Sequence, residues 1–497
     1  MTGGASGTGG DATGTGGVAG GVGDTAAGAA PGPPALRPLL RQVVDAAEGW
    51  LGSLADRPVW TRATYDDMVG ALGGPLPDAP TDPAEVVAQL AEAAEPGLTA
   101  TPAGRFFGFV IGGTHPAGLA ADWLTSAWDQ NAGLTALTPA AAACEAVAAG
   151  WLIDALGLPT SASVGLVTGG MQANFTCLGA ARHGVLARAG WDVESGGLAG
   201  GPPVRVLASA DRHDTIDLSL RYLGLGTGSI VEVASDAQGR VRLDGPDGLA
   251  ARLEATGGDP TIVCLQAGDV HTGAFDPLGE AADLAHERGA WVHVDGAFGL
   301  WAGAASDPAV RALVDGVDRA DSWATDGHKT LNVPYDCGFA IVRDPAVHRA
   351  AFGVRGAYLI NTEAGDPLEL VPEFSRRARG FAVWAVLRSL GRSGLAELVD
   401  RLCRHARRMA EGIAAIPGAT VLNDVVFTQV LAAFGSDEAT RAVARRVLEE
   451  GTAVLTPSTW RGRAVLRCSL SNWSTTDEDI DRTVAALGRI AAEVRGG

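Results

Sequence analysis

Lys329 lies near the end of a run that is typical of a buried strand followed by a polar turn, Asp321-Ser-Trp-Ala-Thr-Asp-Gly-His-Lys-Thr330. Lysine is almost never fully buried without a partner or a function. A lysine taken out of water holds its proton less tightly and becomes a nucleophilic amine, which can form a Schiff base with a carbonyl group. The run therefore predicts a catalytic Lys329, although its spacing alone also fits a surface lysine in a loop.

A second candidate is a carboxylate at the end of an apolar strand, in the run Trp291-Val-His-Val-Asp295. A buried carboxylate is costly unless it pairs with a cation. The protonated ring nitrogen of a pyridine-type cofactor is such a cation, and the pairing keeps the ring an electron sink. The alternative is that Asp295 caps the helix that follows.

Two weaker signals also follow strands. Gly169 and Gly170 join an apolar strand to a helix, and backbone amides at such a helix N-terminus can bind a phosphate. A Gly-Gly turn before a helix is common, and the run matches neither the dinucleotide-binding pattern nor the P-loop. His213, in Ser209-Ala-Asp-Arg-His-Asp, can stack on a flat ring, but a surface or helix-capping histidine fits equally.

The elements that position these residues alternate between short apolar strands and alanine- and leucine-rich helices. Such strands imply a largely parallel sheet covered on both faces, with ligands at the carboxyl ends of its strands. The expected strands are 164–167, 204–209, 230–233, 261–266, 291–294, 322–324 and 338–342. The expected helices between them include 139–156, 172–189, 214–223, 277–288 and 307–313.

Flanking segments differ from this alternating part. Residues 1–34 are mostly Gly, Ala and Thr and are predicted to be disordered. An amphipathic pattern begins near Leu36, and a helix start signal precedes a helix over 81–94. After residue 375 we expect a compact α+β unit with helices 381–415, 438–450 and 478–494 and strands 427–433 and 464–469. The predicted divisions are 1–34, 35–100, 101–375 and 376–497.

Composition excludes several classes of protein. A net charge of −19 argues against nucleic acid or an anionic membrane surface as partner. The six cysteines form no CxxC pair, which favours reduced buried thiols over a disulfide framework or a metal site. The sequence contains no apolar run of about 18 or more residues, so no membrane span is predicted. No signal peptide is evident, so we expect a cytoplasmic protein.

In chain order, the glycine turn, His213, Asp295 and Lys329 resemble the group II pyridoxal-phosphate (PLP)-dependent amino-acid decarboxylases, of the aspartate aminotransferase fold type I. The resemblance covers roughly residues 100 to 480. The motifs that carry it are Arg105-Phe-Phe-Gly-Phe, Trp151-Leu-Ile-Asp, Thr168-Gly-Gly, Ala267-Gly-Asp-Val-His-Thr-Gly-Ala-Phe-Asp276, His293-Val-Asp295, Asp326-Gly-His-Lys329, Pro334-Tyr-Asp-Cys-Gly and Ser375-Arg-Arg-Ala-Arg379 with Trp384.

The resemblance implies an α/β fold with a mostly parallel seven-stranded sheet in a large domain and a small C-terminal α+β domain. It also implies PLP as cofactor, an amino-acid substrate, and a homodimer with shared active sites in which residues 35–100 wrap the partner. Lys329 would form the Schiff base, Asp295 would pair with the ring nitrogen, and Ala297 would lie opposite His213 on the ring. The implied phosphate site is Gly169, Gly170, Met171, Asp326 and His328, with Asp276 supporting the cofactor from behind.

Two departures from the family pattern keep the exact reaction open. Gly268-Asp269-Val270 stands where many members have Gly-Thr-Thr, and His271 is a possible substitute for the missing hydroxyl. The loop at about 361–373 lacks the tyrosine of several members, and the nearest is Tyr358. Decarboxylation to an amine is the leading prediction. Transamination, aldehyde formation, carbon–carbon cleavage and a silent regulatory homologue are the alternatives.

Aromatic residues give a limited indication of the substrate. Phe107, Phe109 and Trp128 lie in the segment that lines the side-chain pocket in the family, and core aromatics are the alternative interpretation. If they line the pocket, the substrate is an apolar or aromatic L-amino acid. His271 and Tyr358 complete the set of candidate substrate-binding residues.

Overall fold

A computed structural model describes residues 33–354 and 365–496, which form two compact units. The smaller unit contains the described residues up to Leu51 together with Tyr65–Glu95. It is built from helices α1 (Pro33–Ser53), α2 (Tyr65–Leu72) and α3 (Pro83–Ala94). The helix start signal before α3 is real, because the Asp82 carboxylate accepts hydrogen bonds from the backbone amides of Ala84 and Glu85. The predicted disordered tail lies outside the described residues, except that its last two residues begin α1.

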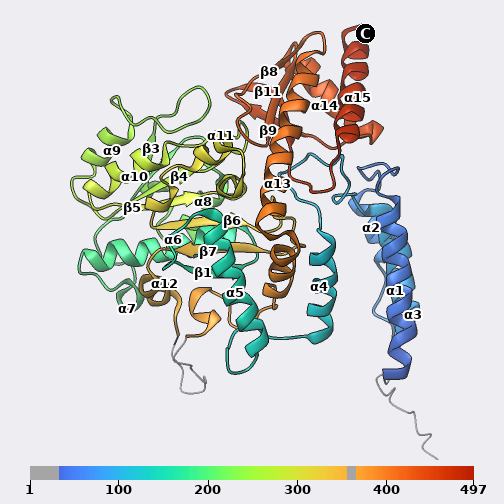
Figure 1. The fold of residues 1–497 in the computed structure, drawn as a ribbon, viewed down its shortest axis with the longest axis horizontal. Helices are drawn as coiled ribbons and strands as arrows, with labels where there is room; N and C mark the ends of the chain where they lie inside the picture. Colours follow the sequence, from blue (N-terminus) through green and yellow to red (C-terminus); the bar gives the residue numbers. More distant parts are fainter. Residues whose placement is uncertain (1–32, 355–364, 497) are drawn as a thin grey trace, which may run out of the picture. The chain divides into compact units, whose positions relative to one another are not determined.

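A seven-stranded sheet is the centre of the larger unit (Figure 1). Its strand order is β1-β7-β6-β5-β4-β2-β3, and only β7 runs antiparallel to its neighbours. The strands are β1 Ser163–Val167, β2 Arg205–Ser209, β3 Ile230–Val233, β4 Thr261–Gln266, β5 Trp291–Asp295, β6 Ser322–Asp326 and β7 Gly338–Val342. Each predicted strand is present within two residues at either end, and the predicted fold class is confirmed.

Two hydrophobic cores, one on each face of this sheet, explain why most of its strands are predominantly apolar. Alternate residues of a strand point to opposite faces. Val292 and Val294 therefore join the core shared with α5, α9 and α10, whereas Trp291 joins the core under α6, α8 and α12. The helices of this unit before the small sheet are α4 Pro116–Trp128, α5 Pro139–Leu156, α6 Gly170–Arg188, α7 Val193–Gly196, α8 Asp214–Tyr222, α9 Leu249–Ala255, α10 Leu278–Glu287, α11 Pro308–Arg311 and α12 Pro345–Phe352.

A small antiparallel sheet follows in the C-terminal part, with strand order β10-β11-β9-β8. The elements of this C-terminal part are α13 Gly380–Ala414, β8 Ala419–Val421, β9 Gln429–Phe434, α14 Asp437–Glu450, β10 Thr456–Trp460, β11 Arg463–Ser469 and α15 Asp477–Gly496. The predicted strands correspond to β9 and β11, whereas β8 and β10 were not predicted. Edge strand β10 contains Pro457 and has no fully buried residue, so it lacks the apolar signal of a core strand.

Helix α5 is long and apolar enough to cross a membrane by length and composition, although no span was predicted. A core helix passes the same test, and α5 has the features of one. Leu152, Ile153 and Leu156 are buried in the core beside the large sheet. The buried Glu145 carboxylate of α5 lies 2.6 Å from Arg376 Nη2, an ion pair that belongs inside a folded protein. The six cysteines are free and five are buried, as predicted.

Candidate active site

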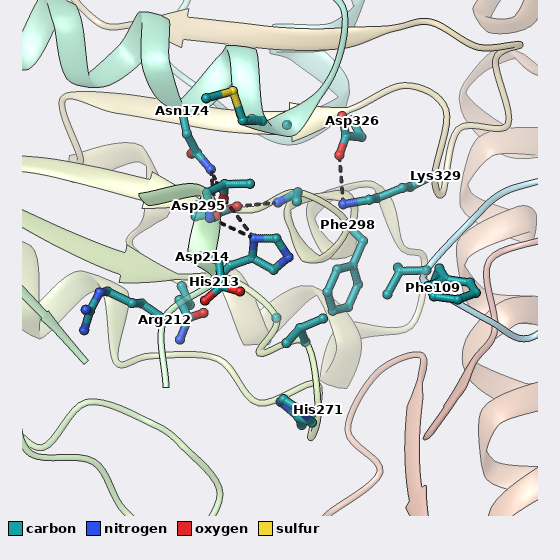
Figure 2. Close-up of a pocket in the computed structure, with 18 of the residues that line it drawn as sticks. Phe109, Asn174, Arg212, His213, Asp214, His271, Asp295, Phe298, Asp326 and Lys329 are labelled. Atoms are coloured by element: carbon teal, nitrogen blue, oxygen red, sulfur yellow. Dashed lines mark hydrogen bonds and ion pairs between the residues drawn. The ribbon is translucent and has the colours of Figure 1, made fainter. Parts of the chain in front are cut away.

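A cavity of about 810 Å³ opens at the carboxyl ends of β1, β2, β4, β5 and β6, and residues of β10 and β11 form its far wall (Figure 2). This is the edge of a parallel sheet at which ligands are expected. The structure brings most of the predicted site together there. The predicted residues that line the cavity are Gly169, Gly170, Met171, His213, His271, Asp295, Ala297, Asp326, His328 and Lys329.

Lys329 lies in the turn after β6 and points into the cavity (Figure 2). Its Nζ is 2.9 Å from Asp326 Oδ2, and a fifth of the side chain remains exposed. Asp326 is buried, and its other oxygen, Oδ1, has no hydrogen-bond partner among the described residues. His328 Nε2 is 3.5 Å from that oxygen, and burial lowers the pKa of His328, so it carries little compensating charge. The amine is thus held at the cavity by one carboxylate.

Asp295 ends β5 on the opposite side of the cavity. Its side chain is largely buried, and its two oxygens accept hydrogen bonds from Asn174 Nδ2 at 2.9 Å and from the backbone amide of Ala297 at 3.1 Å. Neither donor is charged. The carboxylate can therefore still pair with a cationic group in the cavity.

Close approach of neighbouring side chains explains the two glycines after β1. A Cβ on Gly169 would lie 2.9 Å from His328 Cε1, and one on Gly170 would lie 2.8 Å from Asp326 Oδ2. Helix α6 begins at Gly170, and the first amides of a helix have no partner within it. These amides line the cavity together with the positive end of the helix dipole, which suits an anion.

The two histidines on the cavity wall hold different positions. His213 caps α8, because its Nδ1 accepts a hydrogen bond from the backbone amide of Thr215 at 3.2 Å. His213 therefore both caps a helix and lines the cavity, so the capping role does not exclude contact with a flat ring. His271 is more buried, and its Nε2 lies 2.9 Å from Ser458 Oγ beside the ring of Trp460. Burial lowers the pKa of His271 to about 4, so its imidazole is neutral at physiological pH.

Three predicted residues lie elsewhere. Asp276 is buried behind the cavity, where it accepts hydrogen bonds from the backbone amides of Val241 and Gln266, both at 2.7 Å, and burial raises its pKa to about 7. Phe107 does not line the cavity, because its side chain packs in the core of the small C-terminal sheet. Trp128 is also outside the cavity, half-exposed on α4 against Phe381. Tyr358 lies outside the described residues.

Of the three aromatic residues considered for the substrate pocket, only Phe109 lines the cavity, and both it and Val110 have left-handed backbone, with φ of 56° and 57°. Other cavity residues were not identified from the sequence. Arg467 on β11 is 93% buried, faces the cavity, and has a buried Nε without a hydrogen-bond partner among the described residues. An arginine inside the apolar run 464–469 was a signal for it. Asn174, four residues after the glycine turn, was not recognised as the partner of Asp295.

The family model described as the pyridoxal-dependent decarboxylase conserved domain matches residues 69–434. The chain belongs to the pyridoxal-dependent decarboxylase family. Aromatic-L-amino-acid decarboxylase from Bacillus atrophaeus is 27% identical over 484 residues, which cover 92% of this chain and 96% of that protein. L-2,4-Diaminobutyrate decarboxylase from Rhizobium meliloti (strain 1021) is 29% identical over 457 residues, covering 87% and 86%. The crystal structure of Oryza sativa TDC with PLP and tryptamine matches with a TM-score of 0.85 at 25% identity, covering 93% and 98%.

Membership confirms the predicted family and cofactor: the protein is a PLP-dependent amino-acid decarboxylase. The residues present fit that cofactor. A turn of glycines at a helix N-terminus suits its phosphate, an uncharged pair of donors leaves Asp295 free for its ring nitrogen, and a lysine amine reaches the same space.

Proposed function

We propose that this decarboxylase converts an apolar or aromatic L-amino acid to its amine, with Lys329 as the residue that binds PLP covalently. One observation carries the assignment of Lys329. Of the 38 lysine and arginine residues in the chain, Lys329 is the only lysine. Arginine serves wherever a positive charge is needed but cannot supply a nucleophilic amine, so the one retained lysine marks the position where an amine is required.

The remaining roles follow from the positions of the side chains. When bound, PLP delocalises the electron pair left on Cα as one of its bonds breaks. Asp295 would hold the ring nitrogen in its protonated form, and His213 and Ala297 would contact the two ring faces. The amides of Gly170 and Met171 would bind the phosphate.

His328 would complete the phosphate site, and the Asp326 carboxylate beside it, which only accepts hydrogen bonds, would hold Lys329 rather than the phosphate. Lys329 Nζ lies 2.9 Å from Asp326 Oδ2, so this carboxylate positions the amine at the cavity. Lys329 is therefore the nearest group to Asp326 that can hold a proton and release it toward the cavity.

Arg467 would bind a carboxylate of the substrate. Its buried guanidinium faces the cavity with an unsatisfied Nε, and a carboxylate is the ligand that such a group binds most strongly. The neutral His271 cannot supply that positive charge. Apolar atoms of Phe109, Val110 and Phe298 on the wall of the cavity favour an uncharged side chain in the substrate.

A single-lysine chain makes the test direct. The purified protein is loaded with PLP, its absorbance is recorded from 300 to 500 nm, and the complex is reduced with borohydride. We expect a visible band and one modified peptide, the one containing Lys329, in wild type and neither in Lys329→Ala. Release of carbon dioxide with formation of the amine is then measured for each common L-amino acid. A band lost in Lys329→Ala but no carbon dioxide from any aromatic or aliphatic amino acid would contradict the substrate class and leave the lysine assignment standing.

Four statements remain predictions: the homodimer, the role of residues 35–100, the domain divisions at 100 and 375, and the cytoplasmic location. Gel filtration with light scattering tests the first of them. A monomer with full decarboxylase activity would contradict it.

A further inference from the structure

A line of hydrogen bonds runs through the core behind the Asp295 side of the cavity. Trp291 Nε1 donates to Ser322 Oγ over 2.9 Å, and Ser322 Oγ lies 3.0 Å from His293 Nδ1. His293 Nε2 lies 2.9 Å from Asn174 Oδ1. Paired strands β5 and β6 place His293 opposite Ser322, and α6 brings Asn174 over them. Three elements therefore contribute to one line of contacts.

The line divides at the amide group of Asn174. Its Nδ2 donates to Asp295 Oδ2 over 2.9 Å and to Thr215 Oγ1 over 3.1 Å. Thr215 Oγ1 in turn lies 2.9 Å from His213 Nδ1. The two branches reach both of the cavity residues assigned to the cofactor ring, Asp295 and His213 (Figure 2).

The direction of every bond in this line follows from the acceptor at its end. An ionised carboxylate only accepts hydrogen bonds, so the NH₂ group of Asn174 faces Asp295 and its carbonyl oxygen faces His293. That oxygen needs a donor, which places the proton of His293 on Nε2. His293 Nδ1 is then an acceptor and takes the hydroxyl proton of Ser322, whose oxygen accepts from Trp291.

The second branch has a defined direction as well. Thr215 Oγ1 accepts from Asn174, so its hydroxyl proton is available to His213 Nδ1. The backbone amide of Thr215 also donates to that nitrogen, over 3.2 Å. Nδ1 of His213 is therefore the acceptor, and the ring keeps its proton on Nε2.

Burial makes the arrangement rigid. Asn174, His293 and Ser322 are 1% exposed or less, and none of their buried atoms lacks a hydrogen-bond partner. Burial lowers the pKa of His293 to about 4, so its imidazole is neutral at physiological pH and can accept at Nδ1. A buried polar network that is fully satisfied fixes one arrangement of its side chains.

We propose that Asn174 and His293 are positioning residues: the single proton arrangement of this line orients Asp295 toward the ring nitrogen and holds His213 in one tautomer. The proposal rests on the assignment of Asp295 and His213 to the cofactor ring. Neither Asn174 nor His293 needs to touch the substrate. Their effect is on how firmly the protein binds PLP and on the electronic state of the bound coenzyme.

Two amide substitutions of His293 separate positioning from packing. Both Gln and Asn are neutral, but the longer Gln amide reaches the position of imidazole Nε2, whereas the Asn amide reaches only that of Nδ1. His293→Gln therefore keeps a donor to Asn174 and should bind PLP within about threefold of wild type, because the hydrogen bond is retained. His293→Asn leaves Asn174 Oδ1 without a donor and should weaken PLP binding by about tenfold or more.

A second variant acts on the branch point itself. Asn174→Asp matches asparagine in size but places a carboxylate beside the Asp295 carboxylate, so it removes the donor and adds repulsion. We expect PLP affinity to fall by about a hundredfold. Val294→Ala, on the same strand but facing the other core, is the control: it should lower thermal stability and leave the coenzyme unchanged.

The measurements are the PLP dissociation constant of the cofactor-free protein by fluorescence, and the pH midpoint of the visible coenzyme band. We expect the midpoint to move upward in His293→Asn and Asn174→Asp, and to stay at the wild-type value in His293→Gln and Val294→Ala. A ring nitrogen that is held less firmly in its protonated form withdraws less electron density from the carbon bound to Lys329, which explains the direction.

The outcomes are distinct. Wild type without a visible band would contradict the proposed function. A wild-type band with equal PLP affinity and equal midpoints in His293→Gln and His293→Asn would overturn the positioning role alone. If His293→Asn does not fold, Asn174→Asp decides, and wild-type values of affinity and midpoint in that variant would overturn the proposal.

Discussion

The two sides of the active-site cavity are built differently. On the Asp295 side, the buried polar atoms of Asn174, His293 and Asp295 all have hydrogen-bond partners within the protein. Elsewhere on the cavity wall, Asp326 Oδ1 at the end of β6, Gln266 Nε2 at the end of β4 and Arg467 Nε on β11 are buried without a hydrogen-bond partner among the described residues. Leaving such atoms unpaired typically costs about 1–3 kcal/mol each.

The difference indicates what each side is for. A group of side chains whose polar atoms are paired without ligand, as in Asn174, His293 and Asp295, can hold one geometry before the cofactor arrives, and preorganised groups need no rearrangement during the reaction. Side chains with unsatisfied atoms gain their missing partners from what they bind. We therefore expect the group around Asp295 to determine the state of the cofactor, and Asp326 and Arg467 to determine what binds and how strongly.

The same chemical change on the two sides gives the largest predicted contrast. Asp295→Asn removes a charge that nothing else on its side can replace, and kcat/KM should fall by about 10²- to 10⁴-fold, the equivalent of breaking a buried ion pair. Asp326→Asn keeps an acceptor for Lys329 and should cost less than about tenfold. Steady-state decarboxylation measures both. Equal losses in the two variants would show that the sides do not differ in function.

The next largest effect is expected at Arg467. Arg467→Met keeps the length and burial of the side chain but removes its charge, and kcat/KM should fall by about 10- to 100-fold through a higher KM, because a charge-assisted hydrogen bond is lost. The spectrum of the bound coenzyme should not change. Arg467→Lys is the matched control and should recover part of the affinity. An altered coenzyme spectrum with normal KM in Arg467→Met would instead place this arginine at the cofactor.

The sheet that carries the site was predictable because its strands are buried on both faces. Buried strands read as uninterrupted apolar runs, so all seven appeared in the sequence. Strand β10 did not, since an edge strand with Pro457 and half-exposed residues has no such run. That omission had a consequence, because β10 brings Ser458 and Trp460 to the cavity wall.

Residues of the site were predictable to the extent that they directly follow strands. Lys329, Asp295 and Gly170 do so, and a parallel sheet brings such positions to one edge. Arg467 reaches the cavity only because the small sheet packs beside the large one, which no local pattern encodes. Phe107 and Phe109 were both considered for the pocket, and which of them lines it depends on left-handed backbone at Phe109 and Val110, a conformation that bulky residues rarely adopt and their sequence does not signal.

A smaller effect should separate the phosphate turn from ordinary helix glycines. Gly170→Ala brings a Cβ within 2.8 Å of Asp326 Oδ2, so that carboxylate must shift, and PLP affinity should fall by about tenfold. Gly150→Ala, at an exposed position of α5 with open space around it, is the control and should stabilise the protein by about 0.5–1 kcal/mol. Fluorescence titration with PLP and urea unfolding give the two quantities. Unchanged PLP affinity in Gly170→Ala would mean that the turn does not bind the phosphate.

The smallest predicted effect concerns backbone strain opposite the Asp295 side. Phe109 is half-exposed at the cavity with φ of 56°, a conformation that costs a residue with a Cβ about 1–2 kcal/mol. Phe109→Gly and Phe109→Ala both remove the ring, but only glycine adopts this backbone freely. Phe109→Gly should therefore unfold at a higher urea concentration than Phe109→Ala. The difference in the free energy of unfolding should be about 1 kcal/mol, reduced by the larger chain entropy that glycine loses on folding. If the ring contacts an aromatic substrate, KM rises equally in both variants. If KM instead differs between the two variants in the same way as their stability, the effect comes from the backbone rather than from the ring.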